Sequence, residues 1–547
     1  MRTEMIESPP SPREQGRQGM DLARDWRRSV LSPQSSVLDV AVLFVILAYT
    51  LALVPGLTRW PPLVNDEGRE ANLFWVASGV DPTAERMNAH RGFATWGTGG
   101  LQGASAAIIF QLAGVGVFQA RLTSLLWGGA LLIVVYLAGR LYWNRAVGLA
   151  ATALLAVSDP FLVSSHTLRP DIQVATLVIG ALLLAELAVS PGRSGRWALL
   201  AGILLGLSVD THLNTLAFIP LVGMVFPLRQ GWPGFLQRPE GLLFVAGLGL
   251  AAAYYLAVRV LPDPTGFIAG MSYWLGVDKA PPLARPALGL AGVLRNELAR
   301  YQDYFGEEPL ELGLVLLGLG AGLWSAARGS HPARLMMLGL AAAFVFFLVA
   351  VSMKSKYYMV LTYPFYMLLV ARLIERVARG VGARLAVPVR AQQAAPLQSR
   401  VAQHLALVLL VGLAALYPLK AGDRAWENYI RARRYREGQE YAMLTAQLDR
   451  LAGPGAKILA PPVYWIGLRT HPYIDIYVYE RLERQYHMTV SQFLAETRPD
   501  FVITDAKIAT EKPIEKLLYN ELDARATREF VVRHKNYGDV AVYRLHW

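Results

Sequence analysis

Cysteine is absent from the 547-residue chain, which excludes disulfide bonds and thiolate metal sites. Charged residues are scarce at 17%, whereas soluble domains carry about 25%. Hydrophobic residues make up 54% and are concentrated in long runs. This combination excludes an ordinary soluble globular protein. It predicts an α-helical polytopic membrane protein, because a helix needs about 20 largely apolar residues to cross the hydrocarbon core.

Basic residues outnumber acidic ones, and the formal net charge is +12. Most arginines lie in short segments between apolar runs, which is the pattern that orients membrane proteins and not a nucleic-acid-binding patch. We therefore predict membrane lipids as surroundings and no nucleic-acid partner.

The apolar runs predict about eleven membrane spans. The first, Val37–Val54, lacks a small-residue cleavage site and is predicted to be an uncleaved span. The other ten are Leu122–Ala138, Ala146–Val163, Ile172–Val189, Trp197–Leu207, Leu213–Phe226, Leu242–Val258, Leu312–Trp324, Leu335–Val351, Tyr358–Val370 and Leu405–Leu419.

Arginine positions predict the orientation of these spans. The N-terminus holds Arg13, Arg17, Arg24, Arg27 and Arg28 and is expected to be cytoplasmic. The side of the membrane on which the later loops lie depends on whether a further apolar segment, Leu101–Val117, crosses the membrane. If it does not cross, the loops that contain Arg140, Arg193, Arg229, Arg328 and Arg372 all lie on the cytoplasmic side; if it crosses, most lie outside. We therefore expect it to be a partly embedded helix in an outer loop.

The chain divides into three predicted regions. Residues 1–30 are expected to be a disordered cytoplasmic N-terminus, 31–419 a transmembrane domain, and 420–547 a small soluble α/β domain on the extracytoplasmic side. Within the transmembrane domain, 57–118 and 262–308 are predicted external loops and 378–402 a cytoplasmic linker. The C-terminal region is predicted to contain the helix Tyr441–Leu451, the strands Lys457–Ala460, Ile474–Tyr479 and Phe501–Thr504, and a hairpin from Phe530 to Leu545.

Polar side chains from six separated segments are predicted to meet at the outer membrane face. Taken alone, Asp66 and Glu67 are typical of the first turn of a helix. The six segments are Asp66 with Glu67, His90 with Arg91, His166 with Arg169 and Asp171, Asp210 with His212, the loop Asp263–Glu308, and Lys354 with Lys356. Carboxylates mixed with cations on one face indicate a site for a charged substrate.

Four segments of the chain resemble motifs of a known superfamily. NDEGRE at Asn65–Glu70 is similar to a DEARY-type motif of a first external loop, and Ala120–Asp171 to a pair of spans that ends in RPD. KSKYYMVLTYPF at Lys354–Phe365 is similar to a basic RYLLPLYPP-type segment, and RPDFVIT and VAVYRL to the ends of an external domain. In this order and spacing, they resemble the GT-C glycosyltransferases, specifically the bacterial family related to protein O-mannosyltransferases and the lipid A aminoarabinose transferase.

This resemblance implies a GT-C fold and transfer of a sugar from a polyprenyl-phosphate donor, with inversion, to a hydroxyl of a lipid, glycan or protein. It places the enzyme in the bacterial plasma membrane with an extracytoplasmic site. By this resemblance Asp66 is the general base, and Glu67 and Asp171 are further catalytic candidates; Asp171 orients the acceptor or a metal, or holds Arg169. The implied donor-phosphate ligands are Arg69, Arg91, Arg169, Lys354, Lys356 and Tyr357.

The sequence departs from the family at one stretch. Relatives often carry a Glu-Lys pair before Pro-Pro in the first external loop, but the matching WGTGGL at Trp96–Leu101 has no charge. The sequence allows a divalent metal but does not require one, and the candidate ligands are His90, His212 and Asp210. The alternative function is a transporter or flippase of a lipid-linked or anionic substrate, which would be expected to show an internal repeat and charges near mid-membrane. Neither feature is found in the sequence.

Overall fold

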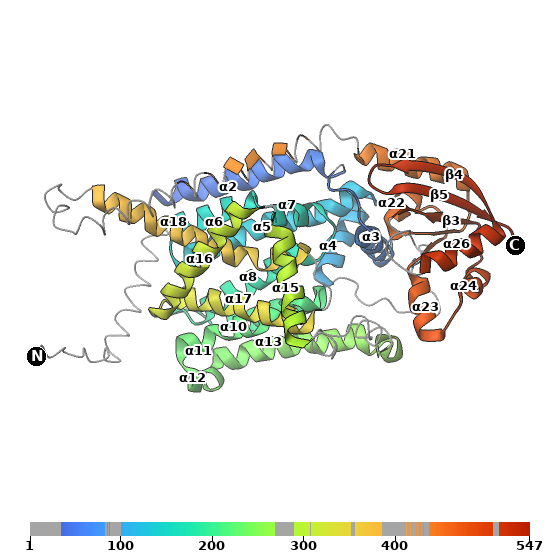
Figure 1. Ribbon diagram of the computed structural model, residues 1–547. Coiled ribbons are helices and arrows are strands. Elements are labelled where there is room, and N and C mark those ends of the chain that lie inside the picture. The colour runs from blue at the N-terminus through green and yellow to red at the C-terminus, as the bar shows by residue number, and fades with distance from the viewer. Residues whose placement is uncertain are drawn as a thin grey trace, which may run out of the picture.

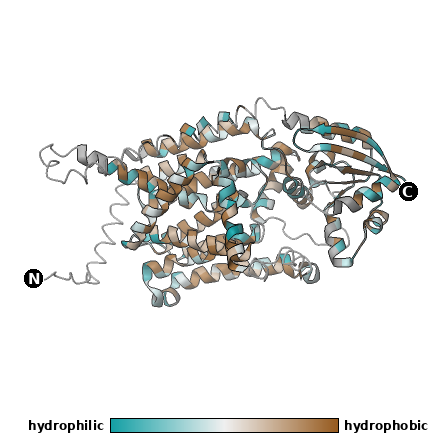
Figure 2. Cartoon of the chain, viewed as in Figure 1, coloured by the Kyte–Doolittle hydropathy of each residue, from teal (hydrophilic) through white to brown (hydrophobic). Residues whose placement is uncertain are grey.

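The computed structural model describes residues 34–58, 60–81, 85, 87, 100–268, 289–306, 308–351, 356–385, 437–506 and 514–547, with isolated positions between 412 and 430. A long helical bundle forms most of the molecule, and an α/β unit lies at one end of it (Figure 1). Hydrophobic residues run along the helices of the bundle, and hydrophilic residues are interspersed through the α/β unit (Figure 2).

The bundle consists of α-helices joined by short 3₁₀ and π segments. In chain order these are α2 (Gln34–Leu53), η1 (Val54–Gly56), α3 (Asn65–Ser78), α4 (Gly100–Ala113), α5 (Val117–Tyr142), α6 (Arg145–Ala156), α7 (Asp159–His166), α8 (Asp171–Ala188), α9 (Arg196–Thr211), η3 (Leu213–Phe218), α10 (Ile219–Gly223), α11 (Val225–Gln230), α12 (Trp232–Gln237), α13 (Pro239–Tyr255), η4 (Leu256–Val260), α15 (Gly289–Phe305), α16 (Pro309–Ala327), α17 (His331–Ala350), η6 (Lys356–Leu361) and α18 (Tyr363–Leu385).

Seven helical segments of the described residues are long and apolar enough to cross a membrane, or eight if the pair α6 and α7, bent by 65°, is one span. The protein is thus a multi-pass membrane protein. Two of the eleven predicted spans fall outside this count for identifiable reasons. Helix α9 has only 16 residues, and α18 carries several arginines along its length. Most of Leu405–Leu419 lies outside the described residues.

Two helices bear on the predicted outer loops. Helix α4 has 14 residues, which at about 1.5 Å per residue is shorter than the roughly 30 Å of hydrocarbon. This length fits the expected non-crossing helix. The loop predicted over 262–308 contains α15, which runs across the long axes of its neighbours (Figure 1). The sequence did not predict this helix, because it mixes polar and apolar residues. Glu297 and Arg300 are buried and form an ion pair.

The C-terminal unit is a five-stranded mixed sheet in the order β2-β1-β3-β5-β4. Strands β1 and β2 pair in parallel, as do β1 and β3, whereas β5 is antiparallel to both β3 and β4. Its elements are α21 (Glu437–Ala452), β1 (Ile458–Ala460), η7 (Pro462–Tyr464), α22 (Trp465–Leu468), β2 (Tyr473–Asp475), α23 (Val478–Tyr486), α24 (Val490–Thr497), β3 (Phe501–Thr504), α26 (Ile514–Arg525), β4 (Ala526–His534) and β5 (Gly538–Leu545).

The predicted hairpin is confirmed as β4 and β5, with Gly538 in the left-handed region at φ 67°. One predicted strand is wrong in its second half. The segment Ile474–Tyr479 is extended only to Asp475, and α23 begins at Val478. The Asp475 carboxylate accepts the backbone N–H of Tyr477 at 2.9 Å, and this local turn ends the strand.

The C-terminal unit and the bundle share a hydrophobic core. Phe74 of α3 and Phe110 of α4 belong to the same buried cluster as Tyr464 and Trp465. A Cβ placed on Gly68 of α3 would lie 1.8 Å from the carbonyl oxygen of Pro462. Only glycine permits this approach of the two backbones, and α3 is consequently enclosed between the bundle and the sheet unit.

Candidate active site

Helix α3 presents the acidic motif at the junction of the two units. Asn65 is its first residue, and Val64 is the N-cap. The Val64 N–H donates to Oε2 of Glu67 at 3.2 Å, so Glu67 makes the capping contact. Asp66 makes no such contact, and about half of its side chain is exposed (51%). Asp66 is therefore available for a role other than helix capping.

Arg169 joins two of the predicted catalytic residues. Its Nη1 donates to Oδ2 of Asp66, and its Nε donates to Oδ2 of Asp171 at 2.9 Å. Asp171 begins α8, is buried, and its Oδ1 accepts no hydrogen bond within the described part of the chain. The structure thus assembles Asp66, Arg169 and Asp171 from α3 and the α7–α8 loop. Of the alternatives for Asp171, the geometry matches the one in which it holds Arg169.

Aromatic residues of η6 cover this cluster. The guanidinium of Arg169 lies over the ring of Tyr357, with its Cζ 4.6 Å from the ring centroid. Burial raises the pKa of Tyr357, which therefore stays a neutral phenol at physiological pH. Tyr358 packs near the ring of His212, with 6.1 Å between centroids. Burial lowers the pKa of His212, so its imidazole is neutral beside the aspartates. Of the residues predicted from these two places, Tyr357 of η6 contacts Arg169 directly, and His212 lies against Tyr358, the next residue of η6.

Glu67 occupies a different environment from Asp66. Its two oxygens accept from Nε and Nη2 of Arg121 at 2.8 Å each, and Oε1 also accepts the N–H of Leu168 at 3.0 Å. Both charged side chains are 1% exposed. This buried fork ties α3 to α5 and to the loop before Arg169. Glu67 therefore holds α3 in place beside the site.

Arg69 turns away from the cluster towards the C-terminal unit. Its Nε and Nη2 donate to Oδ2 of Asp475 at 3.1 and 3.0 Å. Asn65 donates to the hydroxyl of Tyr477 at 3.0 Å, and the hydroxyl of Tyr537 donates to the carbonyl of Leu63. The guanidinium predicted to bind donor phosphate is thus already paired with a buried carboxylate. No local pattern in the sequence could indicate this partner, because 406 residues separate the two.

Glu70 is a site residue that sequence reasoning did not select. It is half-buried, and burial together with the charge of Asp66 raises its pKa to about 7, against the opposing effect of Arg69 and Arg169. In the DEARY-type pattern this position is a tyrosine, so the resemblance pointed to no carboxylate here. The available signal was its spacing of four residues from Asp66, which places both on one helical face.

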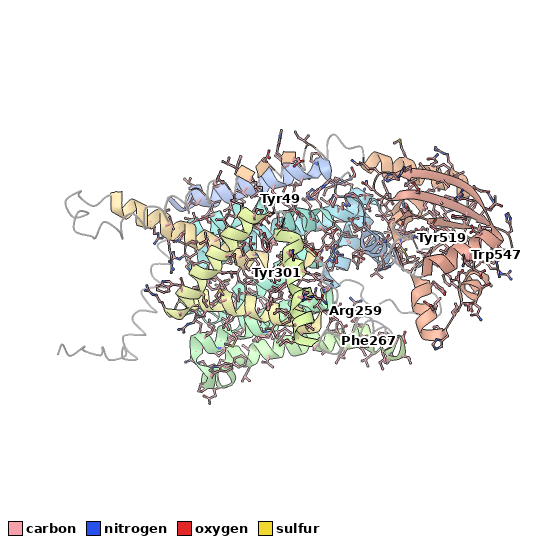
Figure 3. The ribbon with its side chains drawn as sticks, viewed as in Figure 1. Tyr49, Arg259, Phe267, Tyr301, Tyr519 and Trp547 are labelled. Atoms are coloured by element: carbon pink, nitrogen blue, oxygen red, sulfur yellow. The ribbon has the colours of Figure 1, made fainter. Side chains whose placement is uncertain are left out.

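The candidate metal ligands are not assembled by the described residues. Both oxygens of Asp210 accept from Arg259, at 2.9 and 3.2 Å, and Figure 3 shows Arg259 towards the end of the bundle nearest the sheet unit. Nδ1 of His212 accepts the N–H of Asn214 at 3.1 Å. No group of three or more His, Asp or Glu side chains in the described residues is placed to hold an ion.

The remaining predicted residues divide into two sets. His166 is buried, where its Nδ1 lies 2.7 Å from the carbonyl of Leu162 and its ring meets the ring of Trp60. His90, Arg91 and Lys354 lie outside the described residues, as does the side chain of Lys356, whose backbone begins η6.

Comparison with known proteins identifies the fold. Residues 103–256 match the family described as dolichyl-phosphate-mannose-protein mannosyltransferase. No curated protein sequence matches the chain. The structure of ArnT from Cupriavidus metallidurans bound to undecaprenyl phosphate is similar, with a TM-score of 0.61 and 19% identity over 93% of this chain and 98% of that one. The apo state of the same protein gives a TM-score of 0.58 at 18% identity, with the same coverage.

These similarities confirm the fold class predicted from the sequence. The chain has the GT-C fold, in which a helical transmembrane domain is followed by a small C-terminal domain, and the structural similarity to ArnT extends over 93% of the chain.

Proposed function

We propose that this GT-C-fold protein is an integral-membrane glycosyltransferase that moves a sugar from a polyprenyl-phosphate donor to an acceptor hydroxyl. The observation that carries the proposal is the convergence of Asp66, Arg169 and Asp171. Asp66 lies on α3, the helix that packs against the C-terminal unit. ArnT from C. metallidurans, which shares the fold, has been seen bound to undecaprenyl phosphate. That lipid phosphate is the leaving group expected of the proposed donor.

The reaction requires a base and a charge that stabilises the leaving group. The acceptor oxygen attacks the anomeric carbon, its O–H bond breaks, and the bond from that carbon to the phosphate oxygen breaks with its electron pair. Asp66, half exposed and within reach of Arg169, contacts the acceptor hydroxyl as general base. A single displacement from the opposite face inverts the anomeric carbon.

Cations at the site stabilise the phosphate as it gains charge. Arg169 is the described candidate, because it lies at the centre of the cluster and against Tyr357. Arg91, Lys354 and Lys356 are proposed as further phosphate ligands. Arg69 is better suited to holding the C-terminal unit, since Asp475 already neutralises it. Each charge-assisted contact contributes about 1.5–3 kcal/mol.

The distribution of arginine supports an extracytoplasmic site in a bacterial plasma membrane. The acceptor is a hydroxyl of a lipid, glycan or protein that approaches from the aqueous side, where Asp66 is exposed. The alternative of a transporter or flippase is an outcome of the experiment below.

Purified protein in lipid nanodiscs should transfer radiolabel from a panel of polyprenyl-phosphate sugars to a membrane extract of acceptors. Chemical analysis of the product linkage would test inversion. The same protein in proteoliposomes provides the second arm. Movement of the lipid-linked sugar between leaflets, with no covalent transfer by folded protein, would reject the enzyme and support the flippase.

A further inference from the structure

Glu70 lies on the face of α3 that carries Asp66. The two residues are one turn apart, so their side chains project in nearly the same direction. The intervening charged residues project elsewhere, with Glu67 bound to Arg121 in the core and Arg69 bound to Asp475 of the C-terminal unit. Glu70 thus belongs to the catalytic face of the helix.

Every other carboxylate described around this site already has a cationic partner. Asp66 and Asp171 share Arg169, Glu67 holds Arg121, and Asp210 holds Arg259. Glu70 forms no ion pair or hydrogen bond with the described residues, although it is half-buried. A carboxylate that is taken from water without a partner costs free energy, and fold stability gives no reason to keep it there.

The surrounding charges favour proton uptake by Glu70. Burial is the largest cause of its raised pKa, and the charges of Asp66 and Asp171 act in the same direction. Arg69 and Arg169 oppose them, but each faces aspartates that neutralise it. The resulting pKa, about 7, matches that of an efficient base at neutral pH.

We propose that Glu70 is a second catalytic carboxylate, which receives the proton that the acceptor hydroxyl loses. This inference rests on the proposed transferase function. Asp66, held by Arg169, aligns the hydroxyl and first accepts its hydrogen bond. As the oxygen bonds to the anomeric carbon and the phosphate departs with the electron pair, Asp66 takes the proton as general base and passes it to Glu70, whose oxygens have no partner among the described residues. Water removes the proton from Glu70 after product release.

Asp171 is less suited to this task than Glu70. Its Oδ2 accepts from Arg169, and the residue is 1% exposed at the start of α8. Glu70 is partly exposed and its oxygens have no partner among the described residues, so it exchanges its proton with water between turnovers.

The test compares Glu70→Gln, Glu70→Asp and wild type, with Glu521→Gln on the surface of α26 as the matched control. Turnover of a polyprenyl-phosphate sugar is measured from pH 5.5 to 9. Because Glu70 must be ionised to accept a proton, wild-type turnover should rise with pH through about 7 and then level off. Glu70→Gln should lose roughly 10²–10⁴-fold in kcat and lose this rise, with the KM for donor little changed. Glu521→Gln should behave as wild type.

Two results would overturn the inference. One is a Glu70→Gln variant whose kcat stays within about threefold of wild type, far short of the loss of a base. The other is an unchanged pH profile in that variant. If Glu70→Gln does not fold, Glu70→Asp provides the test. In that variant the rise of turnover with pH must occur at a different pH from that of wild type. If wild type transfers no sugar at all, the proposed function fails; difference infrared titration of wild type against Glu70→Gln then tests the free carboxylate, which must titrate near neutrality.

Discussion

Within the motif NDEGRE, each charged side chain has a separate environment. Successive residues of a helix are rotated by about 100°, so Asp66 and Glu70 share a face while Glu67 and Arg69 do not. Glu67 enters the core to meet Arg121, and Arg69 meets Asp475. One helical turn therefore presents Asp66 and Glu70 at the proposed site, Glu67 to the core and Arg69 to the C-terminal unit.

Asp66→Asn should separate catalysis from structure. Asparagine retains an oxygen that accepts from Arg169, so the fold should remain intact. It does not accept a proton, and turnover should fall by roughly 10²–10⁴-fold. Asp523→Asn on α26, at an exposed position, is the control. Transfer kinetics and thermal unfolding are measured on both. Near-normal turnover in the Asp66 variant would exclude it as the base.

Glu67→Gln should mainly lower the stability of the folded protein. It leaves the 1%-exposed guanidinium of Arg121 buried without a counter-charge, which costs about 3–5 kcal/mol. Thermal unfolding in detergent should therefore occur at a markedly lower temperature. The double variant Glu67→Leu with Arg121→Met removes both charges and should recover much of the loss. An unchanged unfolding temperature in Glu67→Gln would contradict a supporting role.

At residue scale the sequence could predict part of the site. The positive-inside rule placed Asp66, Arg169 and Asp171 on one membrane face, and the structure brings them into contact. The sequence could not predict contacts between residues that are far apart in the chain. No periodic pattern connects Arg69 with Asp475 or Glu67 with Arg121, because both pairs depend on how complete elements pack.

Among the elements, α3 depends on a single small residue for its place. A methyl group at Gly68 would collide with the carbonyl of Pro462, so Gly68→Ala should force η7 away from α3 and loosen the C-terminal unit. Gly249→Ala in α13 is the control, because nothing lies within 4 Å of the added Cβ and alanine favours a helix. Limited proteolysis should cleave the C-terminal unit faster in the first variant only. Equal cleavage rates would refute the packing argument.

Element type was predictable where one periodicity dominates. The long apolar runs form the long helices, and the predicted helix Tyr441–Leu451 lies within α21. Helix α15 escaped prediction, because its buried pair Glu297–Arg300 makes the segment resemble a polar loop. The predicted strand Ile474–Tyr479 runs into the first two residues of α23, because only the turn at Asp475 interrupts the alternating IDIYVY pattern.

For the molecule as a whole, the orientation in the membrane can be tested directly because the chain has no cysteine. Ser194 lies in the exposed turn between α8 and α9, and Arg533 is 91% exposed on β4. In intact cells, Ser194→Cys should resist a membrane-impermeant thiol reagent and Arg533→Cys should react. After lysis both should react. Labelling of position 194 from outside would reverse the topology and move the proposed site to the cytoplasm.

The contact between Arg69 and Asp475 also has a consequence for biosynthesis. Ribosomes add about 5–20 residues per second, so the 406 residues between them correspond to roughly 20–80 s of elongation. During that interval α3 has entered the membrane surface without the sheet unit that later covers it. In nascent chains the proposed site therefore lacks its contacts with the C-terminal unit, and a chain released early cannot form them. Completion of the site is thereby tied to the last stages of translation.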